Sequence, residues 1–510
     1  MSMRVRVIKS RYVDSVILMR LAERLAQLDG IDDAAALMGT TANKALLQES
    51  GFVETPPAAK ADDLVVAVKA AADADADAAL AQVEELLDQR RAAHNTRSAR
   101  TLEQALELDP EINLAAISLP GEYATAEARR ALERGLHVFL FSSNVALGDE
   151  IALKTLAAER GLLCMGPDCG TALIAGKALG FGNAVRRGPV GVVGAAGSGI
   201  QAVTSYLDRL GVGVSHAIGC GGRDLSDAVG ARTMRAGLEA LLADDETTAI
   251  LLLSKPPSPT VATELHERAA AARKPVICCF LGESGPETLD DAARAAAAAV
   301  GVAAAPPTPA LDDNTIRALT GRLSPTQHNL RALYAGGTLA YEAQLILGRR
   351  GLTVSSNAPL PGAAAFDGNG HVVLDMGAEE FTSGRPHPMI DARERRARVL
   401  SEADDPSVAV ILLDFVLGFG AAADPAGDLG EAIMSARRHA SDDRRELVII
   451  AFVCGTAADP QNIVEQEQRL REAGALVFDT NAGAVENAAR LITAANLAAP
   501  AVATTAGGGR

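Results

Sequence analysis

The chain of 510 residues has no tryptophan, and Phe and Tyr bring its aromatic content to only 3%. A core without large rings has to be thin and closely packed, which favours layered α/β packing over an aromatic-rich β-sandwich. At this length a single core would be too large, so several domains of roughly 100–200 residues each are expected.

Cysteine is also scarce. The six cysteines include no CxxC pair, so the usual spacing of a zinc site is missing, and we predict no metal ion and reduced, mostly buried thiols. The start of the chain lacks the apolar region of a signal peptide, and no stretch approaches the roughly 20 apolar residues of a membrane span. We therefore expect a cytoplasmic protein.

Positive charge is in deficit. Lys and Arg number 48 against 64 Asp and Glu, a net charge of −16. An acidic surface disfavours binding to nucleic acid or to anionic membranes. We expect a small anionic substrate instead, held by helix N-termini and a few arginines.

The most informative stretch is residues 188–211, in which an apolar run leads into a glycine turn and then into a helical pattern. The turn contains Gly197, Ser198 and Gly199. Glycines allow tight turns and close approach of a ligand, and the free N–H groups of a first helical turn favour an anion such as phosphate. The alternative is a tight turn that binds nothing, because the pattern matches neither the P-loop nor the full dinucleotide fingerprint.

The same pattern occurs a second time. A glycine turn with Gly336, Gly337 and Thr338 again leads into a helix, and two later apolar segments also repeat: 403–415 echoes 243–255, and 447–456 echoes 275–284. Repeats this long indicate a duplicated domain. If the two copies pair face to face, both helix N-termini would point at one anion.

Further substrate-binding candidates follow other expected strands. Strands and helices alternate over 114–165, which predicts a parallel sheet. The candidates are Asp168 and Cys169 in a Gly-Pro turn, Gly221 and Gly222 in a second glycine cluster, and Asn43 after two threonines. Cys169 has no identifiable partner histidine, so a packed thiol is its alternative. Helix capping is the alternative for the segment around Asn43.

Only the second repeat carries the insertion 375–391, which places Arg385 and His387 among prolines and ends at Asp391. Arginine suits a bidentate grip on carboxylate or phosphate, and histidine suits proton transfer near neutral pH. These three residues are our catalytic candidates. The alternative is a loop latched by an Arg–Asp pair, with Asp391 as a helix cap.

Together these segments resemble the FdrA family, which is related to the succinyl-CoA synthetase superfamily. The resemblance is carried by GPDCGT, GVVGAAGSGIQAVTSYLDRLGVG with IGCGGRD, YAGGTLAYEAQLILGRRG, LDMGAEEF, VAVILLDF and GRPHPMID. It implies an α/β fold of several parallel-sheet domains. The implied domains are a small N-terminal α/β domain (1–92), a Rossmann-like CoA-binding-type domain (93–188), two flavodoxin-like ligase-CoA-like domains (189–305 and 331–495), a linker (306–330) and a flexible tail (496–510).

The chain departs from the synthetases in three ways. The loop after the strand near 276–280 has no phosphorylatable histidine, the expected CoA loop before residue 114 is replaced, and no ATP-grasp domain is present. Alone, such a chain should not join an acid to CoA with ATP. No bound cofactor is expected; phosphate or an acyl phosphate enters as substrate, and CoA belongs to an alternative.

The resemblance implies a subunit of an oxamate carbamoyltransferase in purine (allantoin) degradation, which converts oxalurate and phosphate into oxamate and carbamoyl phosphate. The two glycine turns would bind phosphate, Arg385 would hold a carboxylate and His387 would move a proton. Partner subunits in a hetero-oligomer are expected, with homodimerisation as a further option. The alternatives are a subunit of an acyl-CoA synthetase completed by a partner, and a non-catalytic scaffold or sensor.

Overall fold

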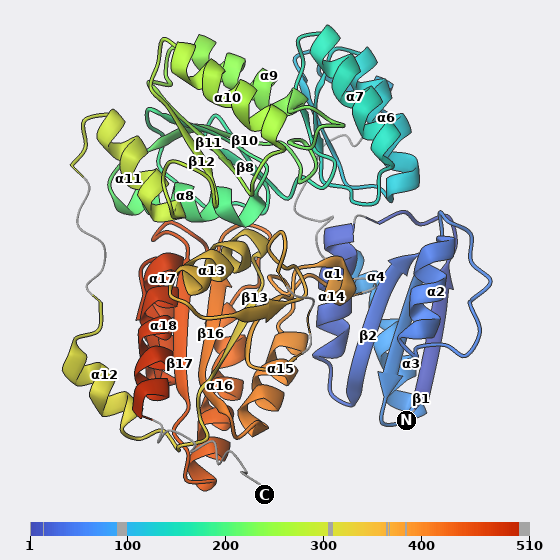
Figure 1. The fold of residues 1–510 in the computed structure, drawn as a ribbon. Helices are drawn as coiled ribbons and strands as arrows, with labels where there is room; N and C mark the ends of the chain where they lie inside the picture. Colours follow the sequence, from blue (N-terminus) through green and yellow to red (C-terminus); the bar gives the residue numbers. More distant parts are fainter. Residues whose placement is uncertain are drawn as a thin grey trace, which may run out of the picture.

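Four β-sheets follow one another along the chain in the computed structural model, which describes residues 2–13, 15–88, 99–303, 310–363, 366, 368–382 and 385–498. Figure 1 shows the N-terminal sheet beside the fourth sheet, with the second and third sheets above them. Most of the predicted tail (496–510) lies outside the described residues, and so do residues 306–309 of the predicted linker.

The N-terminal unit is a three-stranded antiparallel sheet of order β1-β3-β2. Thr40 caps the helix over Thr41–Glu49 by accepting a hydrogen bond from the backbone N–H of Asn43 at 3.2 Å, which agrees with the capping alternative for this segment. The elements are β1 (Ser2–Ile8), α1 (Ser15–Ala26), β2 (Ile31–Met38), α2 (Thr41–Glu49), β3 (Leu64–Ala70), α3 (Asp73–Ala81) and α4 (Val83–Asp88).

The second unit is a three-stranded parallel sheet of order β4-β5-β6, as the alternation over 114–165 predicts. Buried alanines and leucines of α6 and α7, among them Ala128 and Leu153, cover the sheet. The elements are α5 (Leu102–Leu108), β4 (Leu114–Ile117), α6 (Gly121–Glu133), β5 (His137–Leu140), α7 (Leu147–Glu159) and β6 (Cys164–Met165).

The third sheet has the order β12-β11-β9-β10-β7-β8. Its first four strands are parallel, and a hairpin of β7 and β8, which the sequence analysis did not predict, pairs antiparallel at the edge. The elements are β7 (Thr171–Ile174), β8 (Lys177–Gly180), β9 (Val190–Gly194), α8 (Gly197–Arg209), β10 (Val214–Gly219), α9 (Arg232–Ala243), β11 (Ala249–Ser254), α10 (Pro259–Ala271), β12 (Val276–Phe280) and α11 (Leu289–Ala299).

The fourth sheet is parallel throughout, in the order β14-β15-β13-β16-β17-β18. The elements are α12 (Asp313–Thr320), β13 (Asn329–Tyr334), α13 (Gly337–Arg349), β14 (Val354–Ser356), β15 (His371–Asp375), α14 (Glu379–Thr382), α15 (Arg393–Asp404), β16 (Val408–Val416), α16 (Pro425–Asp442), β17 (Val448–Cys454), α17 (Ile463–Glu472), β18 (Ala475–Phe478) and α18 (Asn481–Ala498).

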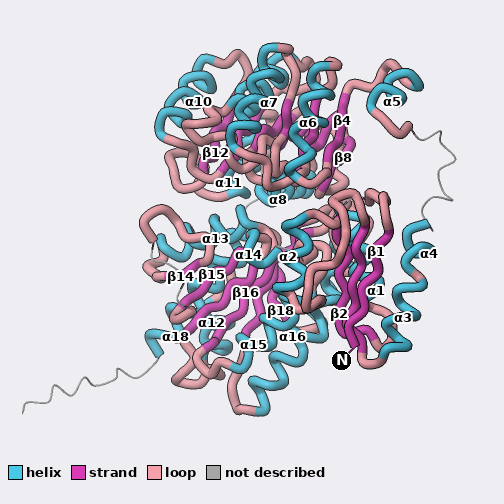
Figure 2. Tube along the Cα trace, turned by 90° about the vertical axis from the view of Figure 1, so that its right-hand side faces the viewer, coloured by secondary structure: helices cyan, strands magenta, loops and turns pink. Residues whose placement is uncertain are grey.

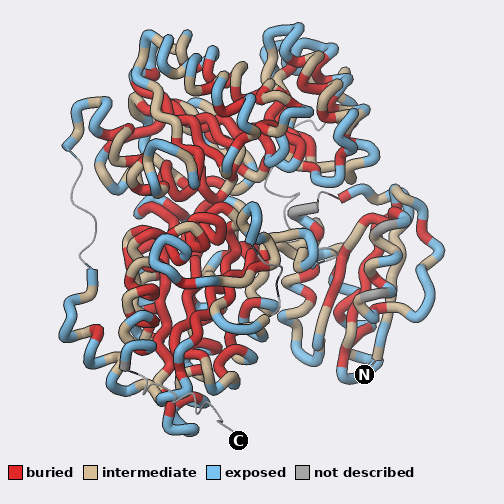
Figure 3. The backbone as a smooth tube through the Cα atoms, viewed as in Figure 1, coloured by how far each residue is buried: buried red, intermediate tan, exposed pale blue. Residues whose placement is uncertain are grey.

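The predicted duplication is confirmed by the topology. The order β10-β9-β11-β12 in the third sheet matches β15-β13-β16-β17 in the fourth, and the repeated apolar segments form β11 with β16 and β12 with β17. The copies face each other through α8 and α11 of one and α13 of the other (Figures 1 and 2). Buried side chains such as Val203, Leu207, Leu339 and Ile346 belong to one continuous apolar core. Figure 3 shows the buried interior of both halves.

No helix in the described part of the chain combines the length and apolar character that crossing a bilayer requires.

Candidate functional site

The two glycine turns lie against each other. The backbone N–H of Thr338, in the first turn of α13, donates a hydrogen bond to Ser198 Oγ, in the first turn of α8, at 3.2 Å. A Cβ on Gly199 would lie 2.9 Å from Thr338 Cγ2, and one on Gly336 would lie 2.9 Å from Ser198 Cβ. The predicted meeting of the turns is therefore confirmed, and it depends on glycine at the contact.

A single cleft of about 1560 Å³ opens over this contact. Loops at the carboxyl ends of parallel strands form much of its wall, which is where open α/β sheets bind ligands. The predicted residues that line it are Asn43, Asp168, Cys169, Gly197, Ser198, Gly221, Gly222, Gly336, Gly337, Thr338, Arg385 and His387. Gly199 lies just behind the wall, and Asp391 is not part of the lining.

The α8 side of the contact can receive an anion. The backbone N–H groups of Gly197, Ser198 and Gly199 begin the helix, and no acceptor among the described residues engages them. Ser198 uses its oxygen as an acceptor and keeps its hydroxyl hydrogen free to donate. Free N–H donors at the positive end of a helix dipole are the usual features of an anion site.

The α13 side is different. The N–H groups of Ala335 and Gly336 donate to the buried carboxylate of Asp414 at 2.7 and 2.8 Å, and that of Thr338 is bound to Ser198. The Asp375 carboxylate lies directly against Gly337. The expectation that Gly336, Gly337 and Thr338 bind the same anion as α8 therefore does not fit Gly336 and Thr338, because their N–H groups already donate to Asp414 and Ser198. No acceptor among the described residues engages the N–H of Gly337, but the Asp375 carboxylate beside it would repel an anion.

His387 lies in the cleft, but as a neutral ring. Its Nδ1 accepts a hydrogen bond from the backbone N–H of Met389 at 3.2 Å, and its ring packs against Phe181 with centroids 5.7 Å apart. Burial, with a smaller contribution from Arg395, lowers the pKa of His387 to about 4. Because Nδ1 is the acceptor, Nε2 carries the hydrogen. The side chain is suited to donate a hydrogen bond, and the expected proton shuttle near neutral pH does not match this pKa.

Arg385 and Asp391 do not pair with each other, and the Arg–Asp pair of the alternative interpretation is formed by Arg393 and Asp391. Arg385 is half-exposed at the edge of the cleft and pairs with Glu394 at 2.8 Å. Asp391 pairs with Arg393 at 2.6 Å, and Arg393 also reaches Asp33 of the N-terminal sheet at 2.6 Å. Asp391 thus anchors the insertion outside the cleft, and the geometry gives it no catalytic contact.

The Gly-Pro turn contributes packing and one carboxylate. The Cys169 thiol is only 2% exposed, its Sγ donates to the carbonyl oxygen of Thr171 at 3.5 Å, and burial raises its pKa to about 12. These contacts favour Cys169 as a packed thiol over Cys169 as a substrate-binding residue. Asp168 is exposed on the wall of the cleft, where the surrounding loops raise the pKa of its carboxyl and the charge of Arg223 opposes the rise. A side chain on Gly221 would collide with the carbonyl oxygen of Pro167, so the two loops touch.

Asn43 also makes structural contacts. Its side-chain amide donates to the carbonyl oxygen of Met38 at 2.9 Å, while its backbone N–H donates to Thr40. These bonds hold the start of α2, so capping accounts for both of them, although the residue faces the cleft.

Lys255 and Asp375 are among the charged residues of the cleft that sequence reasoning passed over. Lys255 directly follows β11 and lies over the ring of Tyr341, with Nζ 5.5 Å from its centroid. Asp375 ends β15. Each stands at the carboxyl end of a parallel strand, a signal that could have identified both.

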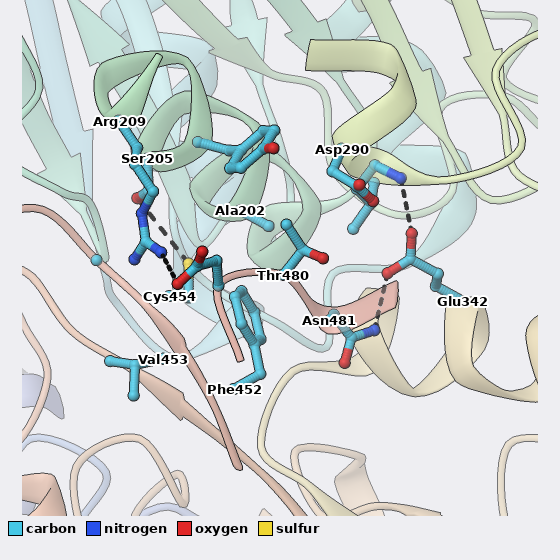
Figure 4. Close-up of a pocket in the computed structure, with 14 residues that line it drawn as sticks. Ala202, Ser205, Arg209, Asp290, Glu342, Phe452, Val453, Cys454, Thr480 and Asn481 are labelled. Carbon is cyan, nitrogen blue, oxygen red and sulfur yellow. Dashed lines mark hydrogen bonds and ion pairs between the residues drawn. The ribbon is translucent and has the colours of Figure 1, made fainter. Parts of the chain in front are cut away.

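A second, much smaller cavity lies between the duplicated copies (Figure 4). Its volume of about 20 Å³ is enough for about one water molecule, so it is no substrate site. On its wall Glu342 accepts hydrogen bonds from the backbone N–H of Leu289 at 2.7 Å and from Asn481 Nδ2 at 2.8 Å. Burial, reinforced by Asp290, raises the pKa of Glu342 to about 7.

This carboxyl makes stability depend on pH. Between pH 4.5 and about 7 the unfolded chain ionises Glu342 while the folded chain keeps it protonated. The contribution of Glu342 to stability should be full below pH 4.5 and should fall, by about 3 kcal/mol at most, as the pH rises to about 7. We expect Glu342→Gln, which cannot titrate, to remove this part of the pH dependence. Parallel melting-temperature curves for both proteins over pH 4.5–8 would contradict the assignment.

Within the described ranges, no three His, Cys, Asp or Glu side chains gather as they would around a metal ion.

Three family models match the chain: "CoA-ligase" over residues 333–491, "CoA binding domain" over 185–282 and "AllF, heavy metal-associated domain" over 1–104. The uncharacterized protein YahF of Escherichia coli K12 is 42% identical over 505 residues, which cover 95% of this chain and 98% of YahF. The chain belongs to the FdrA family. The predicted fold class, parallel-sheet domains of the succinyl-CoA synthetase type with a small N-terminal domain, is confirmed.

The family models place the CoA-binding segment of this FdrA-family chain at other residues than our sequence-based prediction does. The CoA-binding model covers the segment of the third sheet, whereas we predict residues 93–188 as the CoA-binding-type domain, and those bounds stay a prediction. Residues 1–104, which match the heavy metal-associated model, contain no cysteine. Cysteine thiolates are the ligands that soft metal ions such as Cu(I) prefer.

Two solved structures show low similarity. PH0766 from Pyrococcus horikoshii OT3 is 16% identical with a TM-score of 0.30, covering 79% of this chain and 87% of that one. An acetyl-coenzyme A synthetase 1 of Ca. Korarchaeum cryptofilum is 16% identical with a TM-score of 0.29, covering 79% and 89%.

Proposed function

We propose that this protein is a subunit of an enzyme of the acid–thiol (acyl-CoA) ligase type, and that it binds phosphate or an acyl phosphate at the N-terminus of α8. The observation that carries the proposal is the contact of Ser198 with Thr338 at the floor of the cleft, beside the free N–H groups of α8. The matches to the CoA-ligase and CoA-binding families support it.

Each group of cleft residues has its own role in this proposal. The N–H groups of Gly197 to Gly199 hold phosphoryl oxygens, and Lys255 adds a positive charge from the end of β11. His387 donates a hydrogen bond from Nε2 to charge that develops on the acyl oxygen, the role of a preorganised donor. The cleft is far larger than a phosphate needs, which leaves room for a thiol cosubstrate such as CoA.

A partner has to supply the phosphorylated carrier. The segment 281–297, after β12, contains no histidine. Among the described residues of the cleft lining, His387 is the histidine present, and its Nε2 carries a hydrogen instead of a free lone pair. A nucleotide-binding partner subunit that carries its own phosphohistidine would complete the ligase.

The lack of a carrier also favours a second candidate, the carbamoyltransferase. Cleavage of oxalurate by inorganic phosphate gives oxamate and carbamoyl phosphate directly and requires neither nucleotide nor phosphohistidine. In this reaction Arg385, at the edge of the cleft, would hold the carboxylate of oxalurate.

Binding tests the shared part of both candidates. We expect phosphate, acetyl phosphate or carbamoyl phosphate to stabilise the full chain in scanning calorimetry, by about 2.7 kcal/mol at 100 times the dissociation constant. Gly199→Val should abolish the stabilisation and itself cost about 1–3 kcal/mol, because its side chain would separate α8 from Thr338.

Gly348→Ala is the matched control. It adds a methyl group to α13 where no atom lies within 4 Å of the new Cβ, so ligand stabilisation should be unchanged. If none of the three anions stabilises the unmodified chain, the anion site is refuted. Reconstitution with partner subunits then separates the candidates, since release of carbamoyl phosphate from oxalurate and phosphate identifies the transferase and acyl-CoA formation identifies the ligase.

A further inference from the structure

The N-terminal unit shares no apolar core with the rest of the molecule. Its two buried clusters, around Leu25 and around Phe52, contain residues of this unit alone. The other units are packed into one another, because Phe139 of the second sheet shares a cluster with Val193 of the third, and one core joins the third sheet to the fourth. In the described chain no helix or strand of the N-terminal unit packs closely along an element of another unit. The N-terminal unit, drawn in blue in Figure 1, is therefore a separate body beside three fused ones.

This separate body nevertheless forms part of the wall of the cleft. Residues 34–38 of β2 and several residues of the segment 40–46 line it, together with the glycine turns of the duplicated copies. The volume of about 1560 Å³ is thus enclosed between two bodies, and it changes if they move relative to each other. A junction without a common apolar core is the kind across which domains move.

An arginine joins the two bodies. Arg393, the first residue of α15, donates to Asp33 of β2 at 2.6 Å and to Asp391 of its own body at 2.6 Å. The two side chains that meet across the junction are 37% and 39% exposed, so water can replace their contact and the pair can break and re-form. On the side of the second sheet, the Tyr12 hydroxyl lies 3.5 Å from the carbonyl oxygen of Ser118, a weak hydrogen bond.

Carboxylates from both bodies approach each other beside this arginine. Burial raises the pKa of Glu23 on α1, and the charges of Asp391 and Asp428 in the other body raise it further. The charges of Arg20 and Arg393 oppose this rise. Arg393 therefore supplies positive charge between carboxylates that would otherwise repel each other across the junction.

We propose that the N-terminal unit is a movable wall that opens and closes the cleft, and that the ion pair of Arg393 with Asp33 is the latch of the closed state. This assigns a role to the end of the insertion 375–391, since Asp391 holds the arginine in place. A ligand that touches both walls would shift the population toward the closed state, because only that state offers it both contacts. The inference concerns access to the cleft and does not rest on the anion site at α8.

Single-molecule fluorescence energy transfer on the full chain measures the two states. The dyes are attached to cysteines introduced at Glu54 and Asp442, exposed residues of the two bodies, with Cys278 replaced by serine because the other native cysteines are buried. We expect a major short distance and a minor long one. Arg393→Ala should raise the open population about fivefold, the upper range for a partly exposed ion pair. Arg398→Ala is the matched control, because this arginine has similar exposure but pairs within α15.

A double-mutant cycle tests the pair itself. Asp33→Asn should open the cleft about as much as Arg393→Ala does, and the combined variant should open it no further, because each change removes the same contact. Arg393→Lys keeps the charge between the carboxylates and should retain most of the closed population. Additive effects of Asp33→Asn and Arg393→Ala would overturn the pair as the latch.

The outcomes separate this inference from the proposed function, because the fluorescence measurement needs no ligand. A single distance that no variant changes would overturn the movable wall. If phosphate stabilises a chain of that kind in calorimetry, the anion site stands without it. An open population that rises equally in Arg398→Ala and Arg393→Ala would overturn the latch.

Discussion

Replacing Asp414 by alanine is expected to lower the free energy of unfolding of the fourth-sheet unit by about 3–5 kcal/mol. The carboxylate is fully buried and bonds to Arg395 Nη2 at 3.0 Å and to the N–H groups of Ala335 and Gly336. Burial raises the pKa of Asp414 and lowers that of Arg395. Removing the carboxylate leaves a buried guanidinium with backbone carbonyl oxygens but no counter-ion, and it leaves two loop N–H groups without an acceptor.

Urea unfolding followed by circular dichroism measures this effect. Asp404→Ala, which removes an exposed aspartate from α15, should leave the midpoint unchanged. The double variant Asp414→Leu with Arg395→Met removes both charges and should recover part of the loss, since an apolar pair can replace a buried ion pair. A single variant as stable as the unmodified chain would mean that Arg395 finds another partner and that the turn does not depend on Asp414.

The duplication could be predicted from sequence because its signals are local. A glycine turn between an apolar run and a helix is written into a few adjacent residues and can be recognised twice, whereas the shared order of four strands was not predicted and comes from the structure. The edge hairpin of β7 and β8 was missed because each strand has only four residues and pairs antiparallel to a parallel sheet.

The cleft could be predicted only in outline. The glycine turns could be predicted, but not the hydrogen bonds by which Asp414 occupies the N–H groups of Ala335 and Gly336. Those bonds depend on the pairing of β16 with β13, which places Leu413 opposite Leu333. An aspartate inside the apolar run of β16 was the one available hint, because a buried charge requires partners. The low pKa of His387 depends on burial in a wall that includes Phe181, which follows β8 in another segment, and no local pattern contains that contact.

Lys154→Met is expected to cost a similar amount, about 3–5 kcal/mol, in the other half of the molecule. Lys154 Nζ, on α7, bonds to Asp224 at 2.8 Å, to Glu150 at 2.9 Å and to the carbonyl oxygen of Cys220 at 2.9 Å. Burial alone would lower the pKa of Lys154. The carboxylates of Asp224 and Glu150 outweigh this effect and raise the pKa overall. The lysine thereby ties the second sheet unit to the loop after β10.

Lys154→Met should also disturb the cleft, because the loop after β10, which Lys154 holds, contributes Gly221 and Gly222 to the cleft wall. Met fills most of the volume of Lys154 but leaves the buried carboxylate of Glu150 with Arg223 alone, at 2.8 Å, so the deficit is electrostatic. Lys177→Met, on an exposed strand, is the control and should not change the melting temperature. If Lys154→Met melts with the unmodified protein while Glu150→Gln does not, Arg223 and not Lys154 holds this junction together.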